Sequence, residues 1–460
     1  MDHPERASRP ALPLTLAQQA LDQATQRRPE VRFTTAFSCR LRGDLDPGAF
    51  REAVEELVDR HDALRLRVTR PATGPAVQEF REPPAAAEAL RYQRVAPTSP
   101  ERFTAFAARL ATLDAVRPWD LATAPPFRFR LLRHEPGHHA FLATLSLHAA
   151  DGAARRILLR ELWSGYRRRV AGLAAPARPP AGSFAEAVRR HHAGSTAAEL
   201  DRLEHHWSAQ LDRVRPCAFT PPESFAPDRP AERDAPGEAF APRTHRFAIT
   251  GAPLAALRTS IRDRRSSELQ LAYGALAAAL FRHTPQESVT ISCPVDTRRT
   301  DERDVLGMFS LNLPLVVPRT PTGPALLETV RHGWFDLLKH RHVTPATVTA
   351  TAPRSAGWLG ASWANNVRLN YTDDAPGPAR HPAADLARDP VQGPPPTPAP
   401  ALHVEHDSYR LRTVRASAPV HLRVANRPDR LVFALTLDSH RVPDRLAHDL
   451  THALDTLTTA

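Results

Sequence analysis

The sequence is nearly free of lysine. Of its 61 lysine and arginine residues, only Lys339 is a lysine. Cysteine is scarce too. Cys39, Cys217 and Cys293 lie far apart, and no second pair of metal ligands accompanies them at short spacing. These absences argue against a disulfide framework and against a zinc site, so we expect three separate thiols.

Long apolar runs are missing as well. The longest, at residues 269–281, is too short and too interrupted to span a bilayer, and the N-terminal residues lack the charged-then-apolar pattern of a signal peptide. We therefore expect a soluble, cytoplasmic protein with no membrane partner. With 42% hydrophobic residues over 460 positions, the chain is long enough for two cores of ordinary size.

The formal charge of +11 favours an acidic partner in principle, since summed charge steers association with polyanions and acidic proteins. The distribution of the basic residues along the chain argues against a polyanionic partner. The arginines are scattered, and the chain shows no finger, no basic zipper and no basic stripe interleaved with aromatic residues. We therefore expect no nucleic-acid partner.

Strand and helix signals alternate at the start of the chain. Residues 46–58 carry apolar side chains at helical spacing, with Asp46 as the N-cap and Pro47 at the first helical position. Residues 32–41 before this helix and 63–68 after it have extended patterns. The sequence therefore predicts a strand, a helix and a strand.

A hairpin is predicted next. Residues 126–133 alternate apolar and arginine side chains, as a half-buried strand does, and a turn at 135–137 leads to a second strand at 140–148. A helix is expected at 153–170, where apolar residues share one face. The polar residues 148–152 thus stand where a strand leads into a helix.

The second half repeats this mixed pattern after a linker at 172–183 that is rich in proline, glycine and alanine. The linker divides the chain into an N-terminal lobe at 1–175 and a C-terminal lobe at 176–460. A proline-dense tract at 373–401 predicts a long, exposed and weakly ordered loop. The other expected elements are helices at 199–211, 254–262, 268–282 and 444–457, and strands at 289–295 and within 420–437.

Short segments with recognisable motifs cover almost the whole chain in a fixed order. They are Leu12-Pro13-Leu14-Thr15 with Gln18, the runs 41–46 and 60–65, Asp120-Leu121 with 124–128, Trp207 with Leu211, the run 291–298, Gly307-Met308-Phe309, Leu313-Pro314-Leu315 and Asn370-Tyr371. Together they resemble the condensation domains of nonribosomal peptide synthetases, a family related in fold to chloramphenicol acetyltransferase. By this resemblance the chain is identified as a free-standing member with a degenerate histidine motif.

The resemblance implies an α/β (α+β) fold of two chloramphenicol acetyltransferase-like lobes in a V-shaped arrangement with a tunnel between them. In typical members, the phosphopantetheine arms of two carrier proteins enter the tunnel with an acyl thioester and an amine, and the product is an amide. The chain has no room for adenylation or carrier domains, so we expect acyl or peptidyl carrier proteins to act in trans. A small-molecule acceptor is the alternative, and no bound cofactor or metal is expected.

The active-site motif of typical members is two adjacent histidines, three variable residues, then Asp-Gly. Counted back from Asp151-Gly152, the histidine positions hold Ser146 and Leu147. Aligned instead on the preceding strand, His148 replaces the first histidine and two residues are missing before Asp151. Neither alignment supplies the second, catalytic histidine. His148 is therefore the candidate catalytic residue, and the alternative is an ordinary hydrogen-bonded or exposed histidine at a strand end.

Asp151 and Gly152 are expected to have structural roles. The matching aspartate of the family pairs with an arginine of the second lobe, and Arg298 has that place here. A buried carboxylate at a strand-to-helix corner needs an opposing charge, and a bidentate arginine also fixes the loop. Asp151 equally fits a simple helix N-cap. Gly152 is expected to permit a conformation or a close approach that a side chain would obstruct.

Other catalytic signatures are missing. His138-His139 is a second double histidine, but it lies beside a turn without an Asp-Gly at the right distance, so we expect it at the surface. No zinc motif, Ser-His-Asp order, phosphate loop or nucleotide fingerprint is evident. The leading hypothesis is a carrier-dependent acyltransferase that forms an amide or an ester. The rival hypothesis is a non-catalytic platform that docks carrier proteins or tailoring enzymes.

Overall fold

The computed structural model describes residues 11–27, 29, 31–96, 99–135, 137–173, 182–193, 196–219, 242–321, 323–351, 366–373, 402–406 and 418–459. The backbone packs into two compact units. Unit 1 holds the described residues of 1–194, 298–310 and 382–414, and unit 2 holds those of 195–297, 311–381 and 415–460. The chain therefore first leaves unit 1 near residue 194, and two later segments return to it.

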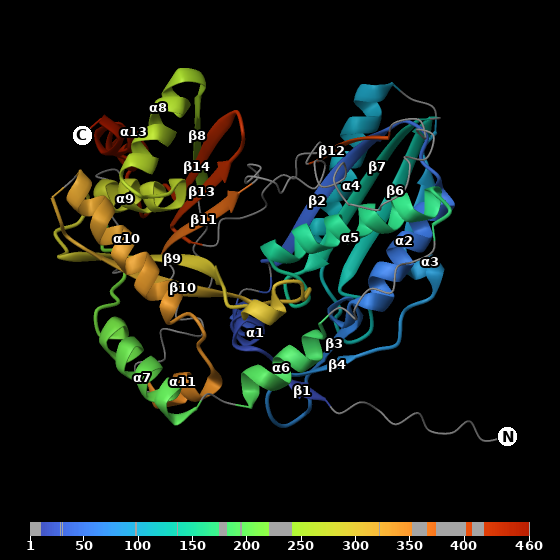
Figure 1. The fold of residues 1–460 in the computed structure, drawn as a ribbon, viewed down its shortest axis with the longest axis horizontal. Coiled ribbons are helices and arrows are strands. Elements are labelled where there is room, and N and C mark those ends of the chain that lie inside the picture. The colour runs from blue at the N-terminus through green and yellow to red at the C-terminus, as the bar shows by residue number, and fades with distance from the viewer. Residues whose placement is uncertain are drawn as a thin grey trace. The chain divides into compact units, whose positions relative to one another are not determined.

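Unit 1 is built on a five-stranded sheet (Figure 1). Neighbouring strands are antiparallel, except that β5 and β6 run parallel. In sheet order the strands are β12 (His403–His406), β2 (Thr34–Arg42), β7 (His138–Ser146), β6 (Phe127–Glu135) and β5 (Arg91–Arg94). An ion pair of 3.1 Å between Arg40 and Glu405 adds to the backbone pairing of the edge strand β12.

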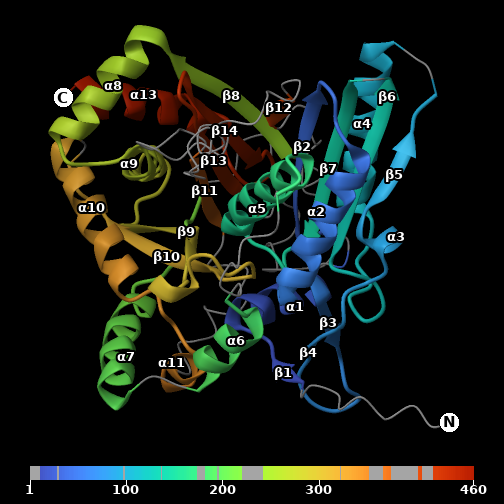
Figure 2. The same cartoon turned by 45° about the vertical axis from the view of Figure 1, so that its right-hand side comes forward.

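Helices cover both faces of this sheet (Figures 1 and 2). Side chains alternate along β7, so Phe141, Ala143 and Leu145 belong to one apolar core and Ala140 and Leu142 to another. The first core includes side chains of α2 (Pro47–Arg60) and α5 (Gly152–Val170), and the second includes side chains of α4 (Pro100–Val116). The hairpin of β6 and β7 is therefore held from both sides.

Helix α2 begins as the sequence predicts. The Asp46 carboxylate accepts hydrogen bonds from the backbone N–H groups of Gly48 at 2.8 Å and Ala49 at 3.1 Å, and Pro47 holds the first helical position. Such a cap satisfies amide groups that have no partner within the helix. Capping by a side chain recurs at the start of α5, where the capping residue is Asp151.

The smaller elements of unit 1 complete the surroundings of the hairpin. A three-stranded antiparallel sheet has the order β1 (Leu12–Pro13), β4 (Val77–Phe80) and β3 (Leu66–Thr69). The remaining helices are α1 (Leu16–Arg27), α3 (Ala86–Ala89), α6 (Phe184–His192) and the two short 3-10 turns at Asp62–Arg65 and Thr300–Glu302.

Unit 2 contains a six-stranded mixed sheet. Its order is β10 (Ser310–Pro318), β9 (Ser288–Asp296), β11 (Val367–Asp373), β13 (Val420–Asn426), β14 (Arg430–Asp438) and β8 (Pro242–Thr250). β11 runs parallel to both of its neighbours, whereas β14 is antiparallel to β13 and β8. The helices of this unit are α7 (Ala197–Leu211), α8 (Gly251–Asp263), α9 (Glu268–Phe281), α10 (Pro324–Lys339), α11 (Pro345–Ala350) and α13 (Arg445–Thr459). Figure 1 shows α8, α9 and α13 on one face of the sheet.

The predicted elements are present with small shifts of their ends. The 63–68 segment differs most, because a 3-10 turn precedes strand β3. The proline-dense tract at 374–401 and the centre of the expected linker, 174–181, lie outside the described residues. The V-shaped arrangement and its tunnel concern how the two units meet and stay predictions.

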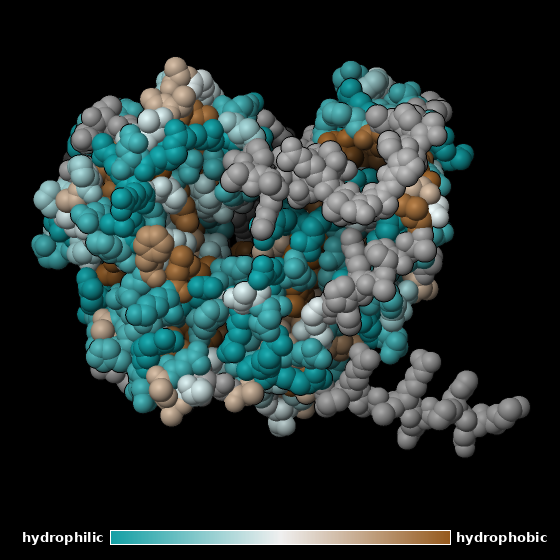
Figure 3. Space-filling view, viewed as in Figure 1, coloured by the Kyte–Doolittle hydropathy of each residue, from teal (hydrophilic) through white to brown (hydrophobic). Residues whose placement is uncertain are grey.

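In the described part of the chain, no helix is both long enough and apolar enough to cross a bilayer. On the face drawn in Figure 3, hydrophilic residues predominate and apolar residues form small, separate groups. The three cysteines are buried, and none joins another in a disulfide.

Candidate functional site at the corner between β7 and α5

A tight corner connects the end of β7 to the start of α5. β7 ends at Ser146, whose carbonyl accepts hydrogen bonds from the N–H groups of Ala149 at 3.0 Å and Ala150 at 3.2 Å. The N–H of Leu147 donates to the carbonyl of Phe33 at 3.0 Å, next to β2. These bonds occupy the backbone of the corner, so the side chains from 146 to 152 have set positions.

Asp151 begins helix α5 from a fully buried position. Its side chain is the N-cap and accepts a hydrogen bond of 2.9 Å from the N–H of Ala154. Its own N–H donates to the carbonyl of Gly307 at 3.2 Å. The residue is only 1% exposed, so the carboxylate needs a partner of opposite charge.

Arg298 is that partner. Its two terminal nitrogens bind the two carboxylate oxygens of Asp151, at 2.7 and 3.1 Å. The same carboxylate accepts from the backbone N–H of Phe309 at 3.0 Å and from the hydroxyl of Ser310 at 3.4 Å. A bidentate pair with further N–H donors is the arrangement that compensates a buried charge best.

The guanidinium of Arg298 is also bound on its other edges. Its Nε donates to the carbonyl of Val305 at 3.1 Å, one terminal nitrogen donates to the carbonyl of Gly307 at 3.1 Å, and the group lies 4.3 Å from the centre of the Phe309 ring. Arg298 belongs to the segment 298–310, which packs as part of unit 1. The expected origin of this arginine in the second lobe is therefore wrong, and the pair ties two segments of unit 1 together.

The expected steric role of Gly152 is not met. A Cβ atom added at this position would meet no atom within 4 Å, and its φ is outside the left-handed range. Gly152 is the first residue of α5 and is exposed. Neither space nor backbone conformation in this structure requires glycine there.

Neither residue at the two histidine positions of the motif is a base. Ser146 is 1% exposed, and its hydroxyl accepts a hydrogen bond from the backbone N–H of His148 at 3.3 Å. Leu147 is partly exposed and apolar. Apart from the carboxylate of Asp151, the imidazole of His148 is thus the one ionisable side chain of the corner 146–152.

The backbone of His148 is anchored from α1. The side-chain amide of Gln18 donates to the carbonyl of His148 at 2.8 Å and to the side-chain oxygen of Gln78, on β4, at 3.0 Å. Gln18 is completely buried, which makes these bonds costly to lose. Gln18 belongs to the first motif of the sequence, but its local pattern did not predict a hydrogen bond to His148, 130 positions away.

The imidazole of His148 is mostly enclosed, with 7% of the residue exposed. Its Nδ1 lies 3.4 Å from the hydroxyl of Ser146. Nε2 makes no hydrogen bond to any described residue, yet it is not one of the fully enclosed polar atoms. Burial lowers the pKa of His148 to about 4, although the negative charge of Asp22 opposes this. The ring is therefore neutral near pH 7.

The surface position expected for His138-His139 is wrong. Both residues lie within β7, where His139 is 3% exposed and the side chain of His138 is 14% exposed. Burial, aided by the charge of Arg133, lowers the pKa of His139 to about 4. The strand begins two residues earlier than its apolar pattern indicated, and this brings the two histidines into the sheet.

Two groups of side chains in the described residues could hold a metal ion. One consists of His134, Glu135 and His138, and the other of His206, Asp336 and His340. Sequence reasoning missed the first group, although its spacing, His-Glu-x-x-His, was visible. A cavity of about 370 Å³ adjoins the second group in unit 2 and is lined by residues of α7, β10 and α10, including Trp207 and Leu315.

Residues 9–345 match the family model described as Condensation domain. A component of linear gramicidin synthase from Brevibacillus parabrevis is 27% identical over 303 residues, which is 66% of this chain and 4% of that protein. Phosphinothricin tripeptide synthetase PhsB of Streptomyces viridochromogenes is 30% identical over 327 residues, which is 69% of this chain and 26% of that protein. The chain thus spans about a quarter or less of the length of these relatives.

Solved structures share the fold. SgcC5 from Streptomyces globisporus has a TM-score of 0.71 at 19% identity, with 97% of this chain and 98% of that chain covered. The X-domain from teicoplanin biosynthesis has a TM-score of 0.72 at 20% identity, with 99% and 96% covered. The first condensation domain of the CDA synthetase has a TM-score of 0.67 at 18% identity, with 97% of each chain covered. The expected α/β fold of two chloramphenicol acetyltransferase-like lobes is confirmed.

Proposed function

The chain belongs to the condensation domain family of nonribosomal peptide and related natural-product biosynthesis, and within it we propose that it is a carrier-dependent acyltransferase. The donor is an acyl or aminoacyl thioester on the phosphopantetheine of a carrier protein. The acceptor is an amine or a hydroxyl, presented by a second carrier protein or by a small molecule. The product is an amide or an ester.

With an amine as acceptor, the reaction needs little acid–base chemistry. The acceptor nitrogen or oxygen attacks the thioester carbonyl, the new C–N or C–O bond forms, and the C–S bond breaks. The phosphopantetheine sulfur leaves and takes up the proton that the acceptor loses. Since attack of an amine on a thioester is favourable, holding both reactants together supplies much of the rate, through an effective molarity that reaches roughly 10⁵ M or more in well-oriented cases.

The observation that supports a transfer role is the state of His148. The ring is neutral, its Nδ1 faces the Ser146 hydroxyl, and its Nε2 has no partner among the described residues. A nitrogen in this state can accept a hydrogen bond from the N–H of an attacking amine. That contact would orient the amine lone pair toward the thioester carbon.

The low pKa limits what His148 can contribute. General acid–base catalysis is most effective when the pKa lies near the working pH, and a pKa of about 4 makes the imidazole a weak proton acceptor at pH 7. Its role is then to position the acceptor rather than to remove its proton. We expect replacement of His148 to lower the rate by about 10²-fold or less, the lower end for a general base.

The decisive experiment measures transfer directly. The protein is incubated with carrier proteins loaded with candidate acyl and aminoacyl groups, and intact-protein mass spectrometry follows loss of the donor and gain of the product. Transfer by the wild type, reduced in His148→Ala and unchanged in His452→Ala, supports the proposal. His452 is a suitable control because it is exposed on α13 in unit 2. Absence of transfer with every loaded pair contradicts it.

A second candidate function is a docking platform without transfer activity. The observation that favours it is the pair Ser146 and Leu147, which leaves both histidine positions of the motif without a base. A structure with the same fold is a complex of the X-domain and OxyB from teicoplanin biosynthesis, so a domain of this fold can bind a partner protein. Binding of a carrier protein or a tailoring enzyme, measured by calorimetry in the absence of any transfer, would establish this alternative.

A further inference from the structure

The turn of the central hairpin carries the sequence His134-Glu135-Pro136-Gly137-His138. On a helix, His-Glu-x-x-His places both histidines on one face and forms a zinc site. Proline and glycine exclude a helix here, and the chain forms a hairpin instead, in which His134 lies on β6 and His138 opens β7. A bulge between Arg133 and Glu135 alters the register, and Glu135 comes to face His138.

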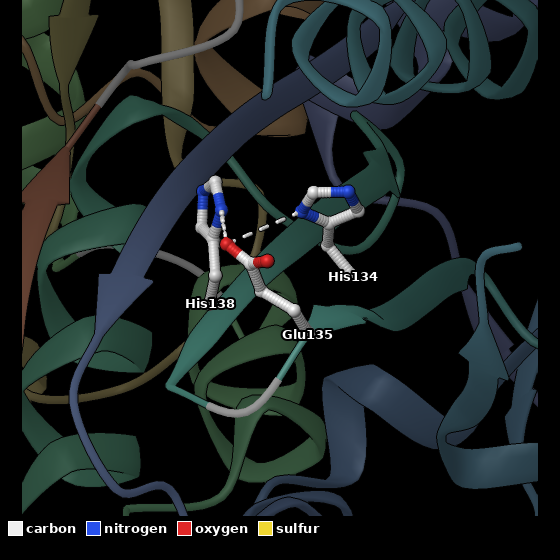
Figure 4. Close-up of side chains that lie close together, drawn as sticks. All are labelled: His134, Glu135 and His138. Atoms are coloured by element: carbon white, nitrogen blue, oxygen red, sulfur yellow. Dashed lines mark ion pairs between the residues drawn. The ribbon is translucent and has the colours of Figure 1, made fainter. Parts of the chain in front are cut away.

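The hairpin brings the two imidazoles to one carboxylate (Figure 4). Oε1 of Glu135 lies 3.8 Å from Nδ1 of His134 and 4.0 Å from Nδ1 of His138. The ligand atoms of the three residues all lie within 4.8 Å of one another. The two rings are nearly perpendicular, at 82°, so the lone pairs that lie in their planes can converge on one point.

We propose that His134, Glu135 and His138 bind a divalent transition-metal ion such as Zn²⁺, with water as a fourth ligand. Zn–N and Zn–O distances of about 2.0–2.1 Å place neighbouring ligands of a tetrahedral ion about 3.4 Å apart. For the two contacts of Glu135 the present separations need to shrink by about 0.4 and 0.6 Å, and the ligand nitrogens of His134 and His138, which lie within 4.8 Å of each other, need to approach to the same distance. The Glu135 side chain is 57% exposed and has room to move.

Packing against Phe103 restricts both rings. The His134 side chain is 3% exposed and stacks on Phe103 of α4, with ring centres 4.9 Å apart and planes 19° apart. The centre of the His138 ring lies 5.0 Å from the centre of the same phenylalanine ring, with the two planes 66° apart. Two ligands that are already ordered lose little rotamer freedom on binding a metal.

The charged groups near the site both favour and oppose metal binding. Burial and the charges of His134 and Arg42 lower the pKa of His138, so this ligand need not lose a proton near pH 7. The positive charges of Arg40 and Arg42 oppose a cation, and the enclosed Nε2 of His138 makes no hydrogen bond to a described residue. Outer hydrogen-bond partners contribute about 10–100-fold to metal affinity, so we expect weaker binding than at a site that has them.

The group in unit 2 has suitable distances, since Nδ1 of His206 and Nδ1 of His340 lie 3.4 and 3.3 Å from the Asp336 carboxylate, but its rings are not oriented toward a shared ion. The rings of His206 and His340 stack at 3.8 Å with planes only 11° apart, so their in-plane lone pairs run side by side instead of converging. Nδ1 of His340 also lies 2.8 Å from the backbone carbonyl of Asp336, where it donates a hydrogen bond. This group also consists of two histidines and a carboxylate and therefore serves as an internal control.

The test is titration of the full chain, without a polyhistidine tag, with Zn²⁺ in competition with a chromogenic chelator. Three single variants accompany the wild type: Glu135→Gln, His138→Gln and Asp336→Asn. Co²⁺ replaces Zn²⁺ in a parallel titration, because four-coordinate Co²⁺ has a characteristic visible absorption. Circular dichroism of each variant checks the fold.

We expect one Zn²⁺ per chain, an affinity at least about 10-fold lower in Glu135→Gln and His138→Gln, and no change in Asp336→Asn. The Co²⁺ absorption should disappear in the first two variants only. Binding that Glu135→Gln leaves unchanged overturns the assignment, as does binding lost in Asp336→Asn or none at all. Glu135 is exposed, so its replacement tests the site without disturbing the fold. The outcome does not depend on transfer activity.

Discussion

Replacement of Asp151 by alanine should destabilise unit 1 far more than loss of an ordinary helix cap. Asp151→Ala removes the cap of α5 and leaves the Arg298 guanidinium buried without its counter-ion. Removing one partner of a buried ion pair typically costs about 3–5 kcal/mol. Arg298 keeps two carbonyl acceptors and the Phe309 ring, so we expect the lower end, about 3 kcal/mol.

Asp46→Ala is the matched control. Asp46 also caps a helix of unit 1, but among the described residues its carboxylate accepts hydrogen bonds only from the backbone N–H groups of Gly48 and Ala49. Losing a cap alone costs about 1 kcal/mol. For domains of 150–250 residues, 1 kcal/mol lowers Tm by about 2–4 °C. Thermal melting should therefore show a decrease of about 2–4 °C for Asp46→Ala and about 6–12 °C for Asp151→Ala.

A double-mutant cycle separates the pair from its parts. Arg298→Ala leaves Asp151 buried without its counter-ion, whereas Asp151→Ala/Arg298→Ala leaves neither charge. The double variant should be more stable than the sum of the single effects indicates, with a coupling of about 1–3 kcal/mol. Equal decreases in Tm for Asp151→Ala and Asp46→Ala, or additive single effects, would refute the reasoning.

Further predictions concern ionisable groups. With a pKa of about 4 in the folded protein, the imidazole of His148 stays neutral above about pH 5. The transfer rate should therefore show no inflection near pH 6.5, the usual pKa of histidine, that arises from this residue. An inflection that disappears in His148→Gln would contradict this prediction. Burial raises the pKa of Glu161, but the hydrogen bond to His61 and the charges of His61 and Arg60 outweigh it and lower the value to about 2. A depressed carboxyl pKa stabilises the fold above about pH 4.5 and loses that contribution, roughly 3 kcal/mol, as pH falls toward 2. Denaturant midpoints between pH 6 and 3 should therefore fall less steeply for Glu161→Gln than for the wild type, and parallel curves would disprove the assignment.

Local patterns predicted the parts of the fold whose causes are local. Helix α2 followed from apolar spacing with Asp46 and Pro47 at its start, and the hairpin followed from alternation and a turn. Edge strand β12 could not be found in this way, because Arg40 and Glu405 are 365 positions apart and only tertiary packing brings them together. The surface position predicted for His138 and His139 was wrong for a similar reason. Two polar residues interrupt an apolar pattern, although strand β7 already begins at His138.

The candidate site shows the same division. The pair of Asp151 and Arg298 was predicted from the resemblance to the family motif, with the need of a buried charge for a partner as its physical reason. The unit to which Arg298 belongs could not be predicted from its place in the chain. The expected need for glycine at 152 rested on the motif alone, and the local geometry contains no such requirement. The metal-ligand spacing at 134–138 usually occurs on a helix, whereas here a hairpin turn brings the same side chains together by another route.

At the corner 146–152, the hydrogen bonds and the ion pair that hold the fold are made by other groups than the imidazole that could take part in transfer. Gln18 holds the carbonyl of His148, and Asp151 with Arg298 holds the start of α5, so neither set of bonds involves the imidazole. Removing the ring should therefore leave the corner in place, and Tm should fall less for His148→Ala than for Asp151→Ala. A loss of transfer in His148→Ala with little change in Tm would then report on the chemistry of the ring. If Tm falls as far as in Asp151→Ala, the imidazole is itself part of the packing that holds the corner, and its loss cannot be read as a loss of catalysis.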